Sequence, residues 1–240
     1  MDRGLYIAAS GMLSEQTRQD QIANDLANAS TPGYKSDIST QHAFGQLLLQ
    51  NTENGQTIGA LGLGAQIAAT VTDMTQAPLK QTGQPLDLAL AGQGFFRVQT
   101  PDGVRYTRDG QLVLDSSGRL QTATGYLVLD TSGQPIKAGS ASGLQVAADG
   151  TVSSNGKSVA QISVVSLTSP VKQGDTLFDG TAGTRPAGTS VVQGSLEGSG
   201  VDATRAMVDM LSSLRTYQSD QQAIQAIDDT LKKGIASGGA

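Results

Sequence analysis

Few residues in this chain could carry out chemistry, and their spacing argues against an enzyme. The 240 residues include no Cys and a single His. This composition excludes disulfides, thiol nucleophiles and thiolate zinc sites, and it leaves His42 as the only imidazole. A hydrolase triad would also need a serine nucleophile, and the sequence contains no G-x-S-x-G motif. We expect no catalytic residue, no cofactor and no metal site, and we interpret His42 as a solvated or partner-contacting side chain.

Two glycine patterns resemble ligand-binding loops, but each has a simpler interpretation. Residues 59–64 read G-A-L-G-L-G, and Ile67 stands where a dinucleotide-binding loop needs its third glycine. We interpret this segment as a turn-rich linker. Asp-Gly and Asn-Gly pairs recur further along, without the alternating acids and closing Glu of a calcium loop. Because these dipeptides favour β-turns, we predict turns at Asp102-Gly103, Asp109-Gly110, 115–118, 130–133, Asp149-Gly150 and Asn155-Gly156.

The composition is that of a turn-rich protein with little charge. Charged residues make up 15% of the chain, and there are 30 Gly, whereas an average domain has about 25% charged residues. The net charge of −5 and the pI of about 4.7 do not fit the basic face of a nucleic-acid binder. No run approaches the roughly 20 apolar residues that span a bilayer, and the N-terminus lacks the pattern of a cleaved signal peptide. We expect no nucleic-acid partner and no membrane insertion.

The first 29 residues have the spacing of one long amphipathic helix. Apolar or small residues recur three to four positions apart from residue 2 to residue 29. Glu15 and Gln19 interrupt this apolar seam. Thr31-Pro32-Gly33 should end the helix, because proline disfavours a helical residue before it and Gly33 permits a sharp turn. The predicted seam residues are Leu5, Ala8, Met12, Ile22 and Leu26.

A second helix with the same spacing is predicted from residue 201 to about residue 233. Asp202 is suited to cap its N-terminus, and Lys232, Lys233 and Gly234 form a C-terminal signal. The predicted seam residues are Met207, Met210, Leu214, Tyr217, Ile224 and Leu231, with Val208, Leu211 and Ile227 widening the face. Two long amphipathic helices at opposite ends of the chain predict a helical hairpin or coiled coil formed by the termini.

The middle of the chain has the pattern of antiparallel β-structure. Short β-rich runs such as 95–98, 126–129 and 162–167 alternate with Asp-Gly and Asn-Gly turns, which is typical of hairpins. We therefore expect an α+β fold with three parts. These are a discontinuous helical domain at 1–33 and 199–237, an extended linker with limited regular structure at 34–80, and an all-β antiparallel domain at 81–198.

The pattern leaves the role of the two apolar stripes open. Apolar residues at helical spacing form the core of one chain as readily as a contact between chains, and periodicity does not separate the two. A secreted β-domain binding module with helical ends, or a cytoplasmic coiled-coil adaptor, would fit the same pattern. The polar face of the first helix mixes Arg3, Arg18, Asp20 and Asp25, without the cationic excess of a membrane-surface helix.

Three segments closely resemble the flagellar rod and hook family of axial proteins. The first, residues 5–37, contains a small-residue run at 8–12, the run I-A-N-D-L-A-N at 22–28 and the turn T-P-G-Y-K at 31–35. The second, residues 81–120, is similar to the strands that open the family's β-domain. The third, residues 191–231, is similar to its C-terminal helix, with Ser199-Gly200-Val201 in place of the usual Ser-Asn-Val. The family-motif residues on this basis are Asn24, Asn28, Gly33 and Tyr34.

The resemblance implies a structural subunit of the bacterial flagellar basal-body rod, most like proximal or distal rod subunits of the F and G types, and not an enzyme. A hook-type subunit is the alternative, although hook subunits usually carry an extra outer domain. The resemblance also implies export by the flagellar type III apparatus without a cleaved signal peptide, and polymerisation through the terminal helices into a torque-transmitting shaft. The implied partners are further copies, other rod and hook subunits, the export apparatus and ring proteins around the rod. The implied location is the basal-body rod, across the periplasm or cell wall.

Overall fold

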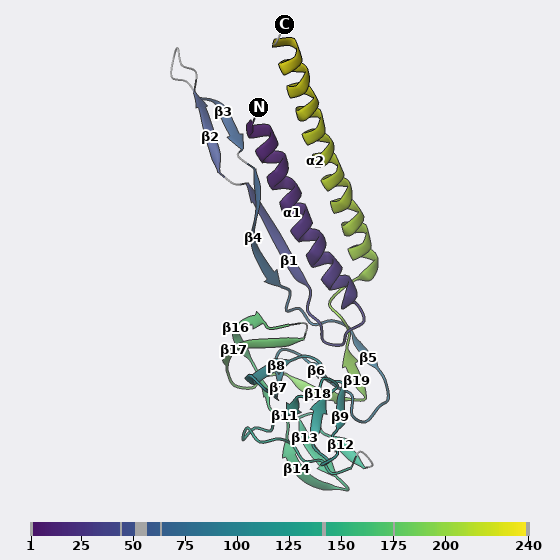
Figure 1. Cartoon of the computed structure of the whole chain (residues 1–240). Helices are drawn as coiled ribbons and strands as arrows, with labels where there is room; N and C mark the ends of the chain where they lie inside the picture. Colours follow the sequence, from purple (N-terminus) through teal and green to yellow (C-terminus); the bar gives the residue numbers. More distant parts are fainter. Residues whose placement is uncertain are drawn as a thin grey trace. The chain divides into compact units, whose positions relative to one another are not determined.

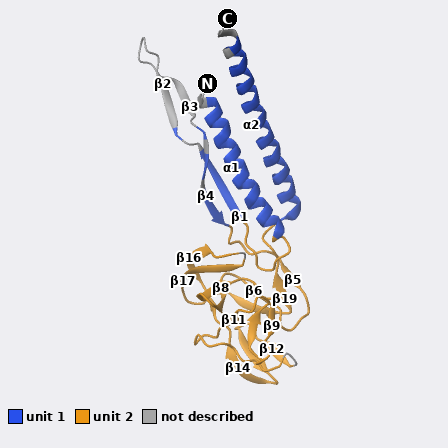
Figure 2. Cartoon of the chain, in the orientation of Figure 1, with its two compact units in different colours: residues 1–27, 37–72, 202–240 blue, residues 28–36, 73–201 orange. Residues whose placement is uncertain are grey.

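The chain folds into two compact units. The computed structural model describes residues 2–43, 45–50, 57–62, 64–140, 143–174 and 176–238. The first unit, here called the helical unit, contains Met1–Ala27, Asp37–Thr72 and Asp202–Ala240, and the second, the β unit, contains Asn28–Ser36 and Asp73–Val201 (Figure 2). The chain therefore crosses between the units four times, after residues 27, 36, 72 and 201.

Two terminal helices pack antiparallel in the helical unit (Figure 1). Helix α1 is Asp2–Ala27 and helix α2 is Ala203–Gly238. The predicted cap of α2 is confirmed, because Oδ1 of Asp202 accepts hydrogen bonds from the backbone N–H groups of Thr204 at 2.9 Å and Arg205 at 3.2 Å. These bonds satisfy donors that a helix N-terminus leaves without an intrahelical partner.

The predicted C-terminal signal at Gly234 is wrong. Helix α2 passes through this residue and ends at Gly238. A single glycine inside a helix costs only about 1 kcal/mol relative to alanine. Just before Gly234, Lys232 Nζ lies 2.6 Å from Oδ2 of Asp228 in an i,i+4 ion pair that supports the helical conformation. The lysines therefore lie before the last turn of the helix and not in it.

The stretch predicted as an extended linker is more regular than its composition indicates. Strand β1 (Asp37–Ala43) pairs with β4 (Ala65–Thr72), and β2 (Gln46–Gln50) pairs with β3 (Thr57–Gly62), all antiparallel. The prediction of limited regular structure at 34–80 is wrong, because β-branched residues face each other across β1 and β4, as Ile38 does with Val71. The glycine stretch at 59–64 lies on β3 as far as Gly62.

The β unit is built from short strands, and all strand pairings among the described residues are antiparallel. The largest sheet has eight strands in the order β16-β17-β8-β7-β11-β10-β9, with β15 also on β7. The strands are β5 (Leu79–Gln81), β6 (Leu88–Ala91), β7 (Phe95–Thr100), β8 (Gly103–Thr107), β9 (Leu112–Leu114), β10 (Leu120–Thr122), β11 (Leu127–Val128), β12 (Leu144–Val146), β13 (Thr151–Ser154), β14 (Lys157–Gln161), β15 (Val164–Val165), β16 (Leu167–Lys172), β17 (Leu177–Ala182), β18 (Ser190–Gln193) and β19 (Ser195–Glu197).

Two hydrophobic clusters form the core of the β unit. The larger cluster includes Leu88 and Leu90 of β6, Phe96 and Val98 of β7 and Val128 of β11, each about 1% exposed or less. The smaller cluster consists of Phe95, Tyr106 and Phe178. Because successive side chains of a strand point to opposite faces, neighbouring Phe95 and Phe96 enter different clusters. This β body and the two terminal helices confirm the predicted α+β class.

The predicted turns at 102–103, 115–118, 130–133, 149–150 and 155–156 are confirmed, and at two of them the bonds of the acid to its own loop are clear. Oδ1 of Asp115 accepts from the N–H groups of Ser117 and Arg119, each at 2.8 Å, and Asp130 makes the equivalent bonds at 130–134. These are the local bonds that favour Asp at turn positions.

Asp109-Gly110 is not a turn, which corrects the prediction. Gly110 lies beside β6, and its carbonyl accepts a hydrogen bond from Leu88 N–H at 2.9 Å. A Cβ at position 110 would lie 1.6 Å from the Leu88 carbonyl oxygen. Glycine is required here because two backbone segments approach closely, and not because of its conformational freedom.

We expect Gly110→Ala to destabilise the β unit by about 3 kcal/mol, because the new methyl group must push β6 away from residue 110. Urea unfolding followed by tyrosine fluorescence measures the loss. The control is Gln111→Ala, which shortens an exposed neighbouring side chain and should change the unfolding free energy by less than about 0.5 kcal/mol. Equal stability of the two variants would contradict the close approach.

Candidate assembly surface and the polar cluster at the chain crossings

The predicted seam residues are only partly buried in the helical unit. Ile22 is buried, and most others are half-buried, namely Ala8, Met12, Leu26, Met210, Tyr217, Ile224 and Leu231. Leu5, Met207 and Leu214 are more than a third exposed. The packing of α1 on α2 therefore uses part of the seam and leaves some of its largest apolar side chains in contact with solvent.

The exposed apolar residues of α2 form one stripe. Met207, Val208, Leu211 and Leu214 lie at helical spacing and are between 41% and 61% exposed. On α1, Tyr6 and Leu13 are 58% and 66% exposed, although the sequence pattern assigns them no role. Contiguous exposed apolar side chains mark surfaces that contact other molecules. We call the α2 residues 207, 208, 211 and 214 the α2 stripe.

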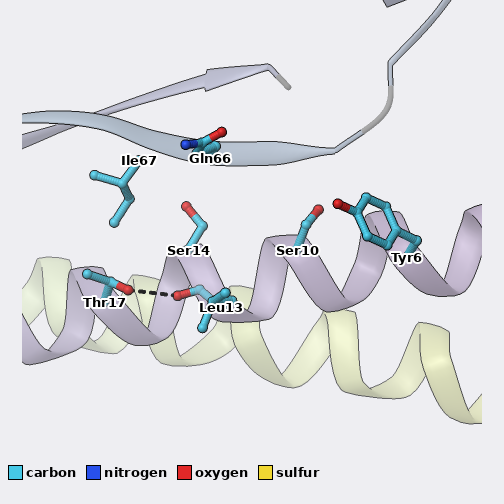
Figure 3. A pocket seen from close by; sticks show the side chains of 7 residues that line it. All are labelled: Tyr6, Ser10, Leu13, Ser14, Thr17, Gln66 and Ile67. Carbon is cyan, nitrogen blue, oxygen red and sulfur yellow. Dashed lines mark hydrogen bonds between the residues drawn. The ribbon is translucent and has the colours of Figure 1, made fainter. Parts of the chain in front are cut away.

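A groove runs between α1 and strand β4 in the helical unit (Figure 3). Its volume is about 360 Å³, and the residues that line it are uncharged: Tyr6, Ser10, Leu13, Ser14, Thr17, Gln66 and Ile67. Thr17 uses its hydroxyl to bond the Leu13 carbonyl of its own helix at 3.0 Å. The groove extends the exposed apolar surface from α1 to the hairpin of the same unit.

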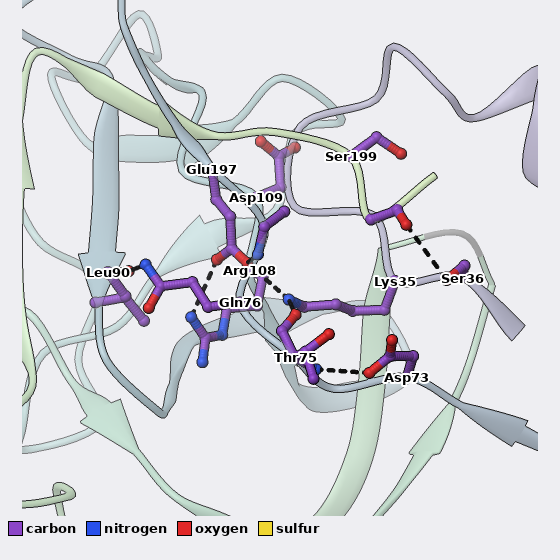
Figure 4. A network of polar contacts seen from close by, with 12 residues as sticks. Lys35, Ser36, Asp73, Thr75, Gln76, Leu90, Arg108, Asp109, Glu197 and Ser199 are labelled. Carbon is purple, nitrogen blue, oxygen red and sulfur yellow. Dashed lines mark hydrogen bonds and ion pairs between the residues drawn. The ribbon is translucent and has the colours of Figure 1, made fainter. Parts of the chain in front are cut away.

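In the β unit, a buried carboxylate collects hydrogen bonds from three segments of the chain (Figure 4). Oε1 of Glu197 accepts from Lys35 Nζ at 2.6 Å and from Ala77 N–H at 3.0 Å. Oε2 accepts from Arg108 NH1 at 3.0 Å. Lys35 Nζ also donates to the Thr75 carbonyl at 2.6 Å. Glu197, Lys35 and Arg108 are between 1% and 3% exposed, so the Glu197 cluster is a dry ion-pair network.

Burial and pairing act in opposite directions on this network. Burial lowers the pKa of the Lys35 ammonium, and its hydrogen bond to Glu197 opposes that shift. The Arg108 guanidinium also lies 5.3 Å from the centre of the Phe95 ring, where the face of an aromatic ring stabilises a cation. A buried charge costs several kcal/mol when it is unpaired, so each member of the network depends on the others.

The T-P-G-Y-K turn docks against the Glu197 cluster. Gly33 has φ +68°, and a Cβ there would lie 2.4 Å from the carbonyl carbon of Arg108. The N–H of Gly33 donates to the backbone carbonyl of Glu197 at 3.0 Å. Tyr34 is fully buried, and Lys172 Nζ lies 4.0 Å from its ring centre. Two of the family-motif residues therefore fix the turn on the body of the β unit.

The other two motif residues have different surroundings. The backbone carbonyl of Asn28 accepts from Thr31 N–H at 3.1 Å and from the Ser199 hydroxyl at 2.9 Å. Its side chain accepts from the Thr31 hydroxyl at 3.0 Å. Asn24 lies exposed on α1. Asn28 thus joins the first and last segments of the β unit.

The segments joined in this region are those that carry the four chain crossings. Residues 28–36 follow the first crossing and precede the second, residue 73 follows the third, and residue 201 precedes the fourth. Asp73 N–H bonds the Ser36 carbonyl at 2.9 Å, and Gly200 N–H bonds the Tyr34 carbonyl at 2.9 Å. The segments of the β unit next to the four crossings are therefore connected to one another by hydrogen bonds within this unit.

Sequence patterns alone did not identify Glu197 and Arg108. The available signal was their rarity in a chain with 15% charged residues, and for Glu197 also its uncharged neighbours in the sequence. Burial of such charges in pairs is the usual solution, but the partners are 89 and 162 residues apart.

A second buried acid lies close to this cluster in sequence. Oδ1 of Asp109 accepts from Gln111 N–H at 2.9 Å. Burial raises the pKa of Asp109 to about 6, and the nearby charge of Asp87 adds to the increase. Unlike the carboxylate of Glu197, this carboxyl is influenced by the charge of another acid.

The remaining candidate sites can be described briefly. His42 lies exposed on β1. Among the residues that the structure describes, no group of three or more His, Cys, Asp or Glu side chains is placed to hold a metal ion. Neither described helix has the length and apolar content needed to cross a bilayer.

Comparisons with known proteins match the chain along most of its length. Three family models match in sequence order: Flagella basal body rod protein at residues 5–35, Flagellar hook protein FlgE/F/G D1 domain at 89–154, and Flagellar basal body rod FlgEFG protein C-terminal at 192–237. These regions contain α1 with the T-P-G-Y-K turn, much of the β unit, and the segment from β18 into α2.

Curated relatives are similar over nearly their whole length. The flagellar basal-body rod protein FlgG of Bacillus subtilis is 34% identical over 258 residues, which cover 97% of this chain and 98% of that protein. The flagellar basal-body rod protein FlgF of Escherichia coli is 32% identical over 253 residues, which cover 95% of each. The flagellar hook-basal body complex protein FlhO of Bacillus subtilis is 32% identical over 264 residues, 97% of each.

We expect Lys35→Met to destabilise the β unit by about 3–5 kcal/mol, because it removes one partner of a buried ion pair and leaves Glu197 underpaired. Thermal and urea unfolding measure the change. Lys80→Met, at an exposed position of β5, removes the same charge and should have little effect. A Lys35→Met protein as stable as Lys80→Met would show that the pair contributes nothing.

Asp109 should make the stability of the β unit depend on pH between about 4 and 6. Because its folded-state pKa of about 6 lies above the ordinary 3.8, the folded state binds a proton in this range that the unfolded state has released. Stability therefore falls as the pH rises from 4 to 6, by up to about 3 kcal/mol, and is constant above that range.

Asp109→Asn keeps the acceptor for Gln111 and removes the titration. We expect this variant to exceed the parent in unfolding free energy by about 1 kcal/mol at pH 4.5 and by about 3 kcal/mol at pH 7.5. A stability difference that is the same at both pH values would contradict the assignment. Backbone N–H groups hold the pKa values of Asp115 and Asp149 below their usual range. These two acids therefore affect the pH dependence of stability only below pH 4.

Proposed function

The chain belongs to the flagellar basal-body rod protein family, of the F/G type, and is a structural subunit of the bacterial basal-body rod; on this premise we propose that it polymerises through its terminal helices. The relatives are structural proteins of the flagellum basal body and not enzymes. The observation that carries the proposal is the α2 stripe, which the helical pair leaves exposed.

The distribution of apolar residues around α2 favours a contact between copies. Two packed helices can each cover only one side of the other, whereas α2 has apolar residues on its inner face and on the α2 stripe. In a rod, neighbouring copies bury the outer side chains through heterologous contacts that continue along the assembly without closing a ring. We assign the predicted seam residues, from Leu5 to Leu26 and from Met207 to Leu231, to helix packing in the rod: the buried and half-buried ones to the contact of α1 with α2, and the exposed ones to contacts between copies, which together form a coiled coil.

The order of the chain suits export in an unfolded state. The two helices of the helical unit come from opposite ends of the sequence, so their packing forms only after the whole chain has left the channel. The absence of Cys means that no disulfide blocks threading or forms wrongly outside. We propose passage through the flagellar type III apparatus without a cleaved signal peptide, and contact with other rod and hook subunits and with surrounding ring proteins.

The Glu197 cluster suits a part that transmits torque. Load between an axial core and an outer domain passes along the covalent chain, and the cluster holds the ends of all four crossings together within the β unit. In this proposal the helical unit forms the axial core and the β unit forms the outer domain. A stiff anchorage limits how far the crossings rotate against one another.

We expect Leu214→Asp to abolish polymerisation of the purified protein or lower it at least tenfold, because a carboxylate at a buried contact between copies would be desolvated without a partner. Sedimentation and electron microscopy measure assembly. Since Leu214 is 41% exposed in the single chain and belongs to the helical unit, the melting temperature of the β unit should not change.

Thr216→Asp is the matched control, because it adds the same charge at an exposed polar position of α2. It should assemble like the parent. Leu26→Asp tests the corresponding position on α1 and should block assembly as well. If Leu214→Asp supports motility in a strain that lacks the native subunit, the surface is wrongly assigned.

A further inference from the structure

An acid lies buried in the contact between α1 and α2, at a position where the seam pattern predicts only an interruption. Glu15 is 6% exposed and Ser213 is 1% exposed. The Ser213 hydroxyl donates to Oε2 of Glu15 at 2.5 Å, and Nε2 of Gln41 on β1 donates to Oε1 at 3.2 Å. One carboxylate therefore joins α1, α2 and the hairpin of the helical unit.

Both oxygens of this carboxylate are used. Besides Gln41, Oε1 has the guanidinium of Arg18 at 4.0 Å, and the Arg18 side chain remains 40% exposed. Burying a carboxylate without donors would be strongly unfavourable. The position of Glu15 is therefore tolerable only while Ser213 and Gln41 lie opposite it.

The apolar contacts between the helices are far less selective. Gly4, for example, lies against Ile227, so a small residue of α1 faces a larger apolar residue of α2. The seam positions repeat every three to four residues on both helices. A slip of seven residues would bring Met210, Tyr217, Ile224 or Leu231 into the place of the next member of this series, and exchanges among apolar side chains cost little when volume is conserved.

We propose that Glu15 is the register-determining residue of the helical pair. A slip of seven residues brings Ala206 or Asp220 to the place of Ser213. Alanine offers no donor, and aspartate brings a second negative charge into a buried site. A polar residue in a helical seam specifies alignment because every wrong register leaves it unsatisfied.

Correct register has a consequence for assembly, which rests on the proposed function. In a rod, α1 and α2 of many copies lie close together, and the α2 stripe faces a neighbour correctly only if α2 is aligned on its own α1. The register itself is a property of one chain, so it can be measured without polymerisation.

The test uses cysteine pairs, which the Cys-free sequence makes unambiguous. Gly4→Cys with Ile227→Cys reports the register of the structure, because a Cβ at Gly4 would lie 3.4 Å from Ile227 Cδ1. Gly4→Cys with Asp220→Cys, or with Gly234→Cys, reports a slip of seven residues in either direction. A short bis-maleimide reagent is applied to the full-length protein, and mass spectrometry quantifies the intrachain crosslinks.

With Glu15 present, we expect the 4–227 crosslink and little of the slipped ones. Glu15→Leu and Ser213→Ala should each raise the ratio of slipped to native crosslinks about tenfold or more. The proposal is overturned if these variants keep the native ratio, or if the 4–227 pair fails to crosslink while Glu15 is present. Should Glu15→Leu unfold the pair, Ser213→Ala, which removes a single oxygen atom, decides the question.

Two controls separate register from general destabilisation. Glu15→Gln retains an oxygen that accepts from Ser213 and should keep the native ratio within about twofold. Ser212→Ala removes the same hydroxyl from the exposed neighbouring position and should leave the ratio unchanged. Leu214→Asp should lose polymerisation and keep the native crosslinks. Failure of the assembly proposal can therefore be distinguished from failure of the register proposal.

Discussion

The structure depends on one constraint: the two ends of the chain fold together, so the middle must leave and re-enter the helical unit. The two ends alone require two crossings, and the return of residues 37–72 to the helical unit adds two more, so the chain crosses after residues 27, 36, 72 and 201. Without further contacts, the four segments of chain at these crossings would be free to move against one another. The Glu197 carboxylate removes that freedom within the β unit, because it accepts from Lys35 and Ala77 beside three of the crossings and lies four residues before the last. The turn at Gly33 and the bonds of Asn28 reinforce the same tie.

The helical unit follows a different rule, because its apolar side chains are not all used. A fold that served only itself would bury its largest apolar residues, and Met207, Val208 and Leu211 are each more than half exposed. Yet the inner contact contains buried Glu15 and Ser213. Polar groups therefore lie inside the contact between the two helices, and apolar groups remain on its outer side, where the proposed contacts between copies would bury them. That arrangement is expected of a structural subunit of the basal-body rod.

Sequence patterns predicted what is local and missed what depends on distant partners. Helical periodicity located both terminal helices, and Asp202 was recognised as a cap because its bonds reach only two and three residues along the chain. Gly234 was misjudged because its small helix penalty does not end a helix that flanking residues support. Gly110 looked like half of an Asp-Gly turn, although the Leu88 carbonyl on another strand explains it. The pairing of β1 with β4 and the partners of Glu197 are likewise invisible without the fold.

Two of the few charged residues of the chain, Glu15 and Glu197, are buried carboxylates with a structural role. With only 4% aromatic residues, the protein has few large, rigid side chains whose shapes would exclude wrong packings. Aliphatic contacts tolerate slippage, because one flexible side chain can replace another. A buried carboxylate does not tolerate it, since each lost donor leaves charge unsatisfied in a dry site. Glu15 and Glu197 each take donors from separate segments of their own unit, so a few buried charges specify alignments that the apolar residues alone would leave degenerate.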